Sequence, residues 1–204
     1  MHELSKPIPI PDGDDANELF NIAYTAFCME IVHKETRPTL FGKFIYIDTK
    51  KALDGEKMDG FWHVASIGVD DSKYDMYPCY NDNTYVKCIY RCKINNPNNF
   101  LKYYNSIPCL YRADKVRWIK EIIELANQNN KHKNLKIWKQ KRKNGDKHLL
   151  IRYINESVDY VIIFKINYKN NKESYYRLIT AYPVVLKSYK RRFDKEYQQY
   201  ISSK

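Results

Sequence analysis

The stretch at residues 131–183, KHKNLKIWKQKRKNGDKHLLIRYINESVDYVIIFKINYKNNKESYYRLITAYP, decides the fold of this chain. Three short turn-forming segments divide it: KNGD at 143–146, NES at 155–157 and YKNNK at 168–172. The runs between them are rich in β-branched and aromatic residues and predict four strands, at about 134–142, 147–154, 159–168 and 173–184. Because the connections are so short, neighbouring strands have to be antiparallel.

Helical spacing of apolar residues predicts two helices ahead of this sheet. The first runs from a cap at Asp14 or Asp15 to about Val32. The second lies in the segment CLYRADKVRWIKEIIELANQNN at 109–130, whose apolar residues share one face. The closing segment KSYKRRFDKEYQQYISSK, at 187–204, predicts a third helix after the sheet.

Three segments between the first two helices carry shorter patterns. FGKFIYID, at 41–48, predicts a strand. FWHVASIG, at 61–68, fits either a short buried strand or the start of a helix, because so short an apolar run shows no clear period. YVKCIYRCKI, at 85–94, is open in the same way, since it alternates like a strand or continues as one side of a helix.

Together these elements predict an α+β fold. Helices in the N-terminal part pack on a C-terminal four-stranded antiparallel sheet, and a C-terminal helix follows the sheet. No repeat and no linker interrupts the sequence, so we expect one domain over residues 1–204. Its parts are an extended or flexible tail at 1–14, a mainly helical part with short strands at 15–130, the sheet at 131–186 and the terminal helix at 187–204.

Positive charge is concentrated in the last third of the chain. The net charge of the whole chain is +11, and residues 131–204 alone carry 19 Lys and Arg against 6 Asp and Glu. Residues 1–60 have the opposite balance, with 7 basic against 11 acidic residues. Such an asymmetry predicts a polyanion as the partner of the C-terminal part. A generally Lys-rich composition is the alternative, but it would not concentrate the charge in one third.

The sequence also predicts the compartment. No run approaches the ~20 apolar residues that span a bilayer, and the polar, Pro-rich start lacks the apolar core of a signal peptide. The cysteines are odd in number and irregular in spacing, and no second Cys or His pair at zinc-ligand spacing accompanies the CxxxC at 88–92. We therefore expect a cytoplasmic protein with reduced thiols, no membrane contact, no metal and no cofactor.

The side chains suited to RNA chemistry cluster in the same part of the sequence. Alternation along the second strand places His148 and Arg152 on one face, and the third strand can add Lys165 to it. On the fourth strand Arg177 and Thr180 are three positions apart, so a regular strand directs them to opposite faces unless a bulge intervenes. Each residue has a structural alternative: Arg152 and Arg177, for example, could pair with acidic residues on neighbouring strands.

RNA can be cut without a metal when its own 2′-OH attacks the adjacent phosphate. Histidine suits the proton transfers because it titrates near neutral pH, and arginine suits the charge that gathers on the phosphoryl oxygens. His63, in the apolar run at 61–68, is the candidate base or acid, although a lone His there also fits a hydrogen-bonded core residue. The basic hairpin supplies candidate phosphate contacts, or else a solvated edge: Lys139, Lys141, Arg142 and Lys143.

Two of these stretches resemble a known family of nucleases. FWHVASIG and HLLIRYINESVDYVIIFKINYKNNKESYYRLITAYPVV are similar to motifs of phage-associated toxin nucleases in the barnase–EndoU–colicin–RelE-like (BECR) ribonuclease superfamily. The resemblance implies a metal-independent endoribonuclease that acts on tRNA or mRNA in a toxin–antitoxin or phage-defence system. It further implies active-site roles for His63, Arg112, Arg152, Arg177 and Thr180. Outside the resemblance, His148 is the reserve candidate for the base or acid.

The expected function is therefore an endoribonuclease toxin that makes 2′,3′-cyclic phosphate ends. Its partners would be RNA and an antitoxin, either an acidic protein or an RNA, that competes for the basic face. The main alternative is a non-catalytic nucleic-acid-binding or anti-defence protein of phage or mobile-element origin. Such a protein shares the basic sheet but needs no histidine. A protein-interaction module with a basic face is a third hypothesis.

Overall fold

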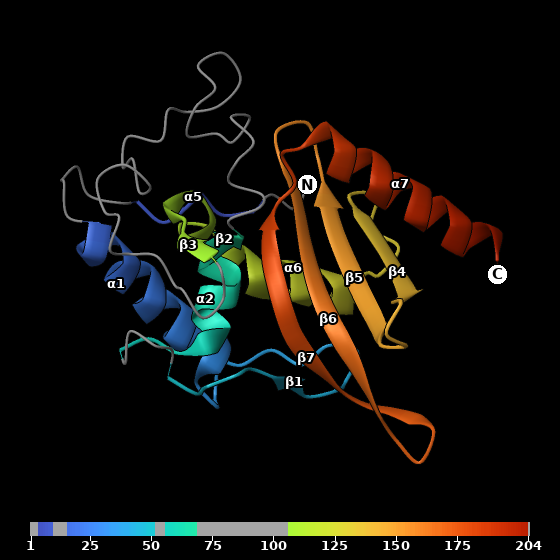
Figure 1. The fold of residues 1–204 in the computed structure, drawn as a ribbon, viewed down its shortest axis with the longest axis horizontal. Coiled ribbons are helices and arrows are strands. Elements are labelled where there is room, and N and C mark those ends of the chain that lie inside the picture. Colours follow the sequence, from blue (N-terminus) through green and yellow to red (C-terminus); the bar gives the residue numbers. More distant parts are fainter. Residues whose placement is uncertain (1–3, 10–15, 52–55, 69–105, 204) are drawn as a thin grey trace.

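The centre of the structure is a five-stranded sheet in the order β1-β7-β6-β5-β4 (Figure 1). The structure is a computed structural model and describes residues 4–9, 16–51, 56–68 and 106–203. The predicted element at 85–94 lies outside these residues. The strands are β1 (Ile45–Tyr46), β4 (Leu135–Lys141), β5 (Lys147–Ile154), β6 (Asp159–Lys169) and β7 (Lys172–Pro183).

Local turn chemistry defines the four long strands. β4 to β7 are antiparallel neighbours in chain order, as the sequence predicts. Gly145, in the first hairpin, has a φ of 88°, a left-handed conformation that glycine adopts without strain. The β6–β7 hairpin instead places two asparagines there, Asn170 and Asn171, with φ values of 51° and 61°.

The prediction of four strands in the sheet is wrong, because β1 adds a fifth. Of the segment at 41–48, only Ile45 and Tyr46 form a strand in the main sheet, and they pair in parallel with Tyr176 and Arg177 of β7. The sheet is thus mostly antiparallel with one parallel edge. β7 has β1 on one side and β6 on the other, so it is an inner strand over this part of its length.

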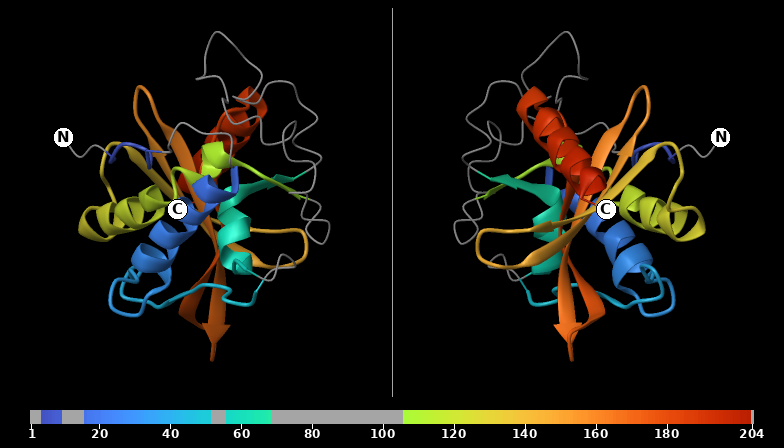
Figure 2. Two further views of the ribbon diagram at one scale, coloured as in Figure 1. Left: turned by 90° about the vertical axis from the view of Figure 1, so that its left-hand side faces the viewer. Right: turned by 90° about the vertical axis from the view of Figure 1, so that its right-hand side faces the viewer.

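Helices cover both faces of the sheet (Figure 2). Two α-helices of the main core are α1 (Ala16–Phe27), which continues into the π-helical turn η1 (Cys28–Val32), and α6 (Arg117–Gln128). They pack with the sheet residues Ile151, Ile162 and Phe164. The C-terminal helix α7 (Lys187–Ser202) lies on the other face, where Phe193 packs on Trp138 and Leu150. The α+β class and the C-terminal helix are therefore confirmed.

Two short helices and a second, small sheet complete the described chain. The segment at 61–68 is both of its predicted alternatives in succession: the helix α2 (Asp59–Ala65) and then the strand β2 (Ser66–Gly68). β2 pairs with β3 (Ser106–Pro108), which leads into α5 (Leu110–Ala113).

No helix among the described residues is long and apolar enough to cross a membrane. Of the described cysteines, Cys28 is partly buried and Cys109 is buried, and the other three lie outside the described residues.

Candidate functional site

A row of polar side chains crosses the sheet on the face that carries α7. Strand register aligns one residue from each strand, in the order Gln140, His148, Lys165, Arg177 and Tyr46. We call this set the polar row. None of its five members is buried, whereas the next row of the same face begins with Trp138 and Leu150 under α7. The polar row is thus a strip of charged and polar side chains beside an apolar part of the same face.

A β-bulge in β7 brings Thr180 onto the face of the polar row. Lys165 pairs with Arg177 and Phe164 with Leu178, but Ile163 pairs with Thr180, so Ile179 is an extra residue. The bulge reverses the alternation that would otherwise separate Arg177 from Thr180. Arg177 and Thr180 therefore lie on one face of the sheet. The sequence analysis required a bulge for this, and the bulge is present.

His63 approaches this face from α2. The Thr180 hydroxyl donates a hydrogen bond of 2.7 Å to the backbone carbonyl of His63, which ties the helix to the bulged part of β7. The His63 side chain is partly exposed. Partial burial lowers its pKa, the nearby carboxylates of Asp59 and Asp48 act in the opposite direction, and Arg177 lowers it further. A lowered pKa keeps the imidazole neutral at pH 7, which is the form that accepts a proton.

Asp48 joins α2 to the polar row. Its carboxylate accepts a 2.7 Å ion-paired hydrogen bond from Arg177, and its backbone carbonyl accepts a 2.9 Å bond from the N–H of Gly60 at the start of α2. A Cβ on Gly60 would lie 2.8 Å from the Asp48 carbonyl oxygen and 2.8 Å from Ile47 Cγ2. Only glycine lets the helix come this close, and the close approach places His63 within electrostatic range of Arg177.

His148 stands in the polar row two strands away from Arg177. The Arg142 guanidinium donates a 3.2 Å hydrogen bond to His148 Nδ1, and Asp146 pairs with Lys165 at 2.8 Å. Partial burial lowers the pKa of His148, with a further contribution from the positive charge of Arg142. Since neighbouring strands are ~4.8 Å apart, His148 and Arg177 are separated by about 10 Å, with Lys165 between them.

Two predicted arginines lie apart from the polar row. Arg152 is 2% exposed and makes two 2.7 Å hydrogen bonds to the carboxylate of Asp159, plus one of 3.1 Å to Asp194 on α7. Burial alone would lower the pKa of Arg152, but these two carboxylates outweigh it and the pKa is raised. Pairing with an acidic residue on the next strand is the structural alternative that the sequence offered for this arginine.

Arg112 is also buried, at 8% exposure. It donates a 2.7 Å hydrogen bond to the carbonyl of Ser66 and its guanidinium lies 4.7 Å from the centre of the Tyr182 ring. These contacts connect α5 to β2 and β7. On β7, Arg112 contacts Tyr182, which is two residues after Thr180. Arg112 therefore lies near the site, in a packed environment.

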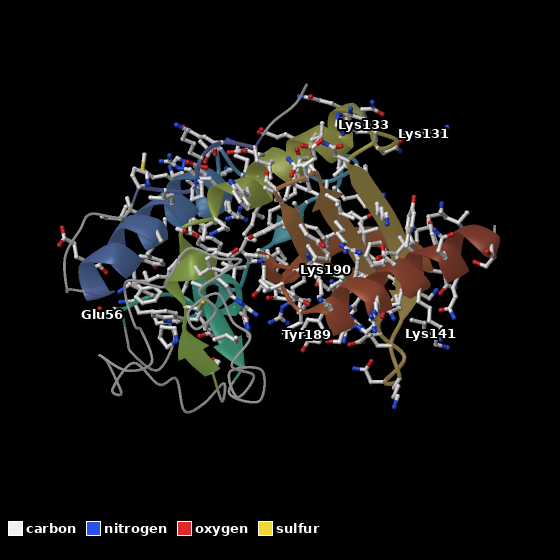
Figure 3. All side chains as sticks on the ribbon, turned by 90° about the horizontal axis from the view of Figure 1, so that it is seen from above. Glu56, Lys131, Lys133, Lys141, Tyr189 and Lys190 are labelled. Atoms are coloured by element: carbon white, nitrogen blue, oxygen red, sulfur yellow. The ribbon has the colours of Figure 1, made fainter. Side chains whose placement is uncertain are left out.

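The predicted basic hairpin is divided between the two faces. Arg142 lies at the polar row, where it contacts His148. Lys139 precedes Gln140 on β4, so it points to the opposite face of the sheet, and it pairs with Glu173. Lys141 and Lys143 are exposed at the end of the hairpin. Figure 3 shows Lys131 and Lys133 beside the end of α6 and Lys190 on α7, with the strands between them, so further basic side chains also lie on both sides of the sheet.

Sequence reasoning missed Asp48 and Tyr46 as neighbours of the site. Both belong to the segment at 41–48, which was predicted as a strand without a partner. A strand of two residues that pairs in parallel with a distant part of the chain leaves no local signal.

Replacement of Thr180 by valine tests the link between β7 and α2. Valine keeps the shape but removes the hydroxyl, so the His63 carbonyl loses its donor and the free energy of unfolding should fall by about 1 kcal/mol. Urea denaturation measures the change, and Thr180→Ser, which keeps the donor, should be close to wild type. Equal stability of the valine and serine variants would contradict this role.

Comparisons of the chain with protein-family models, with curated proteins and with solved structures find no match. Within the described ranges, no group of three or more His, Cys, Asp or Glu side chains is placed to hold a metal ion. The site is therefore interpreted from its own geometry.

Proposed function

We propose that this chain is an endoribonuclease toxin of the metal-independent kind, which cleaves tRNA or mRNA at the polar row. One observation carries the proposal: the bulge at Ile179 gathers Arg177 and Thr180 on one sheet face, with His63 held beside them by the Thr180 hydrogen bond. A neutral histidine, a partly exposed arginine and a partly exposed lysine are the groups that RNA transesterification uses. The similarity to BECR nuclease motifs supports the same function.

In the proposed reaction, His63 takes the proton of the ribose 2′-OH. The 2′ oxygen forms a bond to phosphorus, the bond from phosphorus to the 5′ oxygen breaks, and the products carry a 2′,3′-cyclic phosphate and a 5′-OH. Arg177 and Lys165 stabilise the charge on the phosphoryl oxygens. The leaving 5′ oxygen takes its proton from solvent water at the polar row, because His148 has a lowered pKa and its Nδ1 accepts the hydrogen bond from Arg142. Thr180 is a positioning residue for His63.

Bound phosphate would replace the acids that now pair with these cations. Arg177 is paired with Asp48 and Lys165 with Asp146, and both basic side chains are partly exposed, at 42% and 36%. The Lys165–Asp146 pair is partly exposed on both sides and contributes little to stability, so its exchange for a phosphate costs little. The Asp48 side chain is only 13% exposed, so the loss of Arg177 as its partner costs more, and the phosphate contacts have to offset that cost. An antitoxin that presents carboxylates or phosphates to the polar row would compete with substrate in the same way.

The pKa of His63 predicts the acid side of the rate profile. A base whose pKa is lowered stays deprotonated below the ordinary value of 6.5, so kcat/KM should begin to fall only below that pH. Asp59 raises this pKa, so Asp59→Asn should move the acid limb to still lower pH. Cleavage rates of one oligoribonucleotide from pH 4.5 to 8 measure both. If kcat/KM already falls at pH 6.5 or above, and if Asp59→Asn does not shift this pH, His63 is not the base.

The function itself is tested by incubation of the purified chain with a tRNA pool and an mRNA in EDTA. Discrete fragments with 2′,3′-cyclic phosphate and 5′-OH ends are expected. RNA that stays intact but shifts on a native gel would reject the nuclease and favour the non-catalytic binder. Salt-dependent RNA binding of either kind would count against a pure protein-interaction module.

A further inference from the structure

The exposed aromatic side chains of the described residues gather at one end of the sheet. There are four of them: Phe44 (49% exposed), Tyr46 (38%), Tyr168 (42%) and Tyr175 (37%). All come from β1, the residue before it, or the β6–β7 hairpin, which Figure 1 shows next to one another. Most other large aromatic side chains of the described residues, such as Phe61 and Trp138, pack in the two cores.

Three of these rings lie on the face of the polar row. Ile45 and its partner Tyr176 are buried in the main core, so alternation directs the residues on either side of them to the opposite face. These residues are Phe44 and Tyr46 around Ile45, and Tyr175 before Tyr176. We call the three rings the aromatic corner. Tyr46 is itself the last member of the polar row, so the corner is continuous with the proposed cleavage site.

Two arginines lie against rings of the aromatic corner. The Arg177 guanidinium is 5.6 Å from the centre of the Tyr46 ring, and Arg37 is 5.2 Å from that of Phe44. The Tyr46 and Tyr175 rings are 6.4 Å apart and meet edge to face at 62°. The strands hold the backbone of these residues in place, so ligand binding costs little conformational entropy.

Exposed aromatic rings with an arginine against two of them match the chemistry of an unpaired nucleotide chain. A base presents a flat π-face to an exposed ring while its phosphate contacts the adjacent cation. In a duplex the bases are already stacked on one another and their faces are unavailable. A protein partner could use the same rings. It would not need Arg177, the cation of the proposed phosphate site, to lie against the Tyr46 ring.

We propose that Phe44, Tyr46 and Tyr175 form a stacking platform for unpaired bases next to the phosphate held at Arg177. This deepens the proposed function and rests on it for the position of the phosphate. It names the substrate class as single-stranded RNA, such as a loop or an unstructured stretch. The platform selects unpaired segments without reading their sequence, because every base has a π-face.

Binding of a probe that the chain cannot cleave tests the platform independently of catalysis. The probe is a fluorescent 2′-O-methyl 12-mer, used as a single strand and as a duplex, because its blocked 2′ oxygen removes the proposed nucleophile. Tyr46→Leu, Tyr175→Leu and Phe44→Leu should each weaken single-strand binding about ten-fold and leave duplex binding unchanged. Tyr46→Phe keeps the ring and should bind as wild type, and Tyr168→Leu is the control for an exposed tyrosine outside the aromatic corner.

A second readout is photo-cross-linking of the same strand with one 5-iodouridine, which should attach to Tyr46 or Tyr175. Single-strand affinity that is unchanged in all three leucine variants, or an equal loss for strand and duplex, would overturn the platform. Failure of the proposed function looks different: the wild-type chain would bind the single strand through the aromatic corner and leave RNA uncut in EDTA.

Discussion

Arg152→Met should lower the free energy of unfolding by about 3 kcal/mol, because it leaves the nearly buried Asp159 carboxylate with only the longer 3.8 Å contact to Lys190. Arg152 is 2% exposed, and the side chain of its main partner, Asp159, is 13% exposed. The same guanidinium holds α7 on the sheet through Asp194. Chemical denaturation of the purified variant measures the change.

Two matched variants separate the parts of this network. Asp194→Asn should cost less than about 1 kcal/mol, because the Asp194 side chain is 49% exposed and the Arg152–Asp159 pair remains. Arg152→Met combined with Asp159→Leu should recover most of the stability, since it removes both charges together. A stable Arg152→Met protein that binds RNA poorly would instead support the phosphate contact that the sequence suggested for Arg152.

His63→Ala should reduce RNA cleavage by about 100-fold or more while RNA affinity stays within about three-fold of wild type. General acid–base catalysis by a placed side chain contributes a factor of this size. The side chain is partly exposed and its tie to β7 is made by the backbone carbonyl, so the fold should not change. Single-turnover cleavage and fluorescence anisotropy on one oligoribonucleotide give the two quantities.

His33→Ala is the control for this variant, because His33 is an exposed histidine at the end of η1. It should cleave RNA at the wild-type rate. If His63→Ala is as active as His33→Ala, His63 has no part in the mechanism, and His148 becomes the candidate base. A His63→Ala protein that no longer binds RNA would instead make His63 a binding residue.

The sequence predicts the four long strands well because their boundaries are written in local chemistry. The hairpin residues Gly145, Asn170 and Asn171 adopt left-handed conformations, which glycine and asparagine allow. Along the strands between these turns, the alternation of apolar and polar residues indicates which side chains face the core. The amphipathic pattern of α6 is equally local. The segment 61–68 stayed ambiguous because a helix and a strand share it.

The candidate site depends on features that have no local signal. The Asp48–Arg177 contact joins residues 129 positions apart, and β1 is too short for a pattern to reveal its partner. The bulge at Ile179 lies in the run LITAY, where apolar residues fit both faces. Arg152 and Arg177 look alike in the sequence, and only the position of α7 separates a buried arginine from an accessible one.

The central claim is that the RNA's own 2′-OH is the nucleophile at the polar row. The most direct measurement compares an oligoribonucleotide with one cleavage site against the same oligonucleotide carrying a single 2′-deoxy substitution at the nucleotide that is cut. The proposed mechanism predicts that cleavage at that position disappears in EDTA while binding is unchanged. Continued cleavage at the deoxy position would contradict it, because water and not the ribose would then be attacking the phosphate.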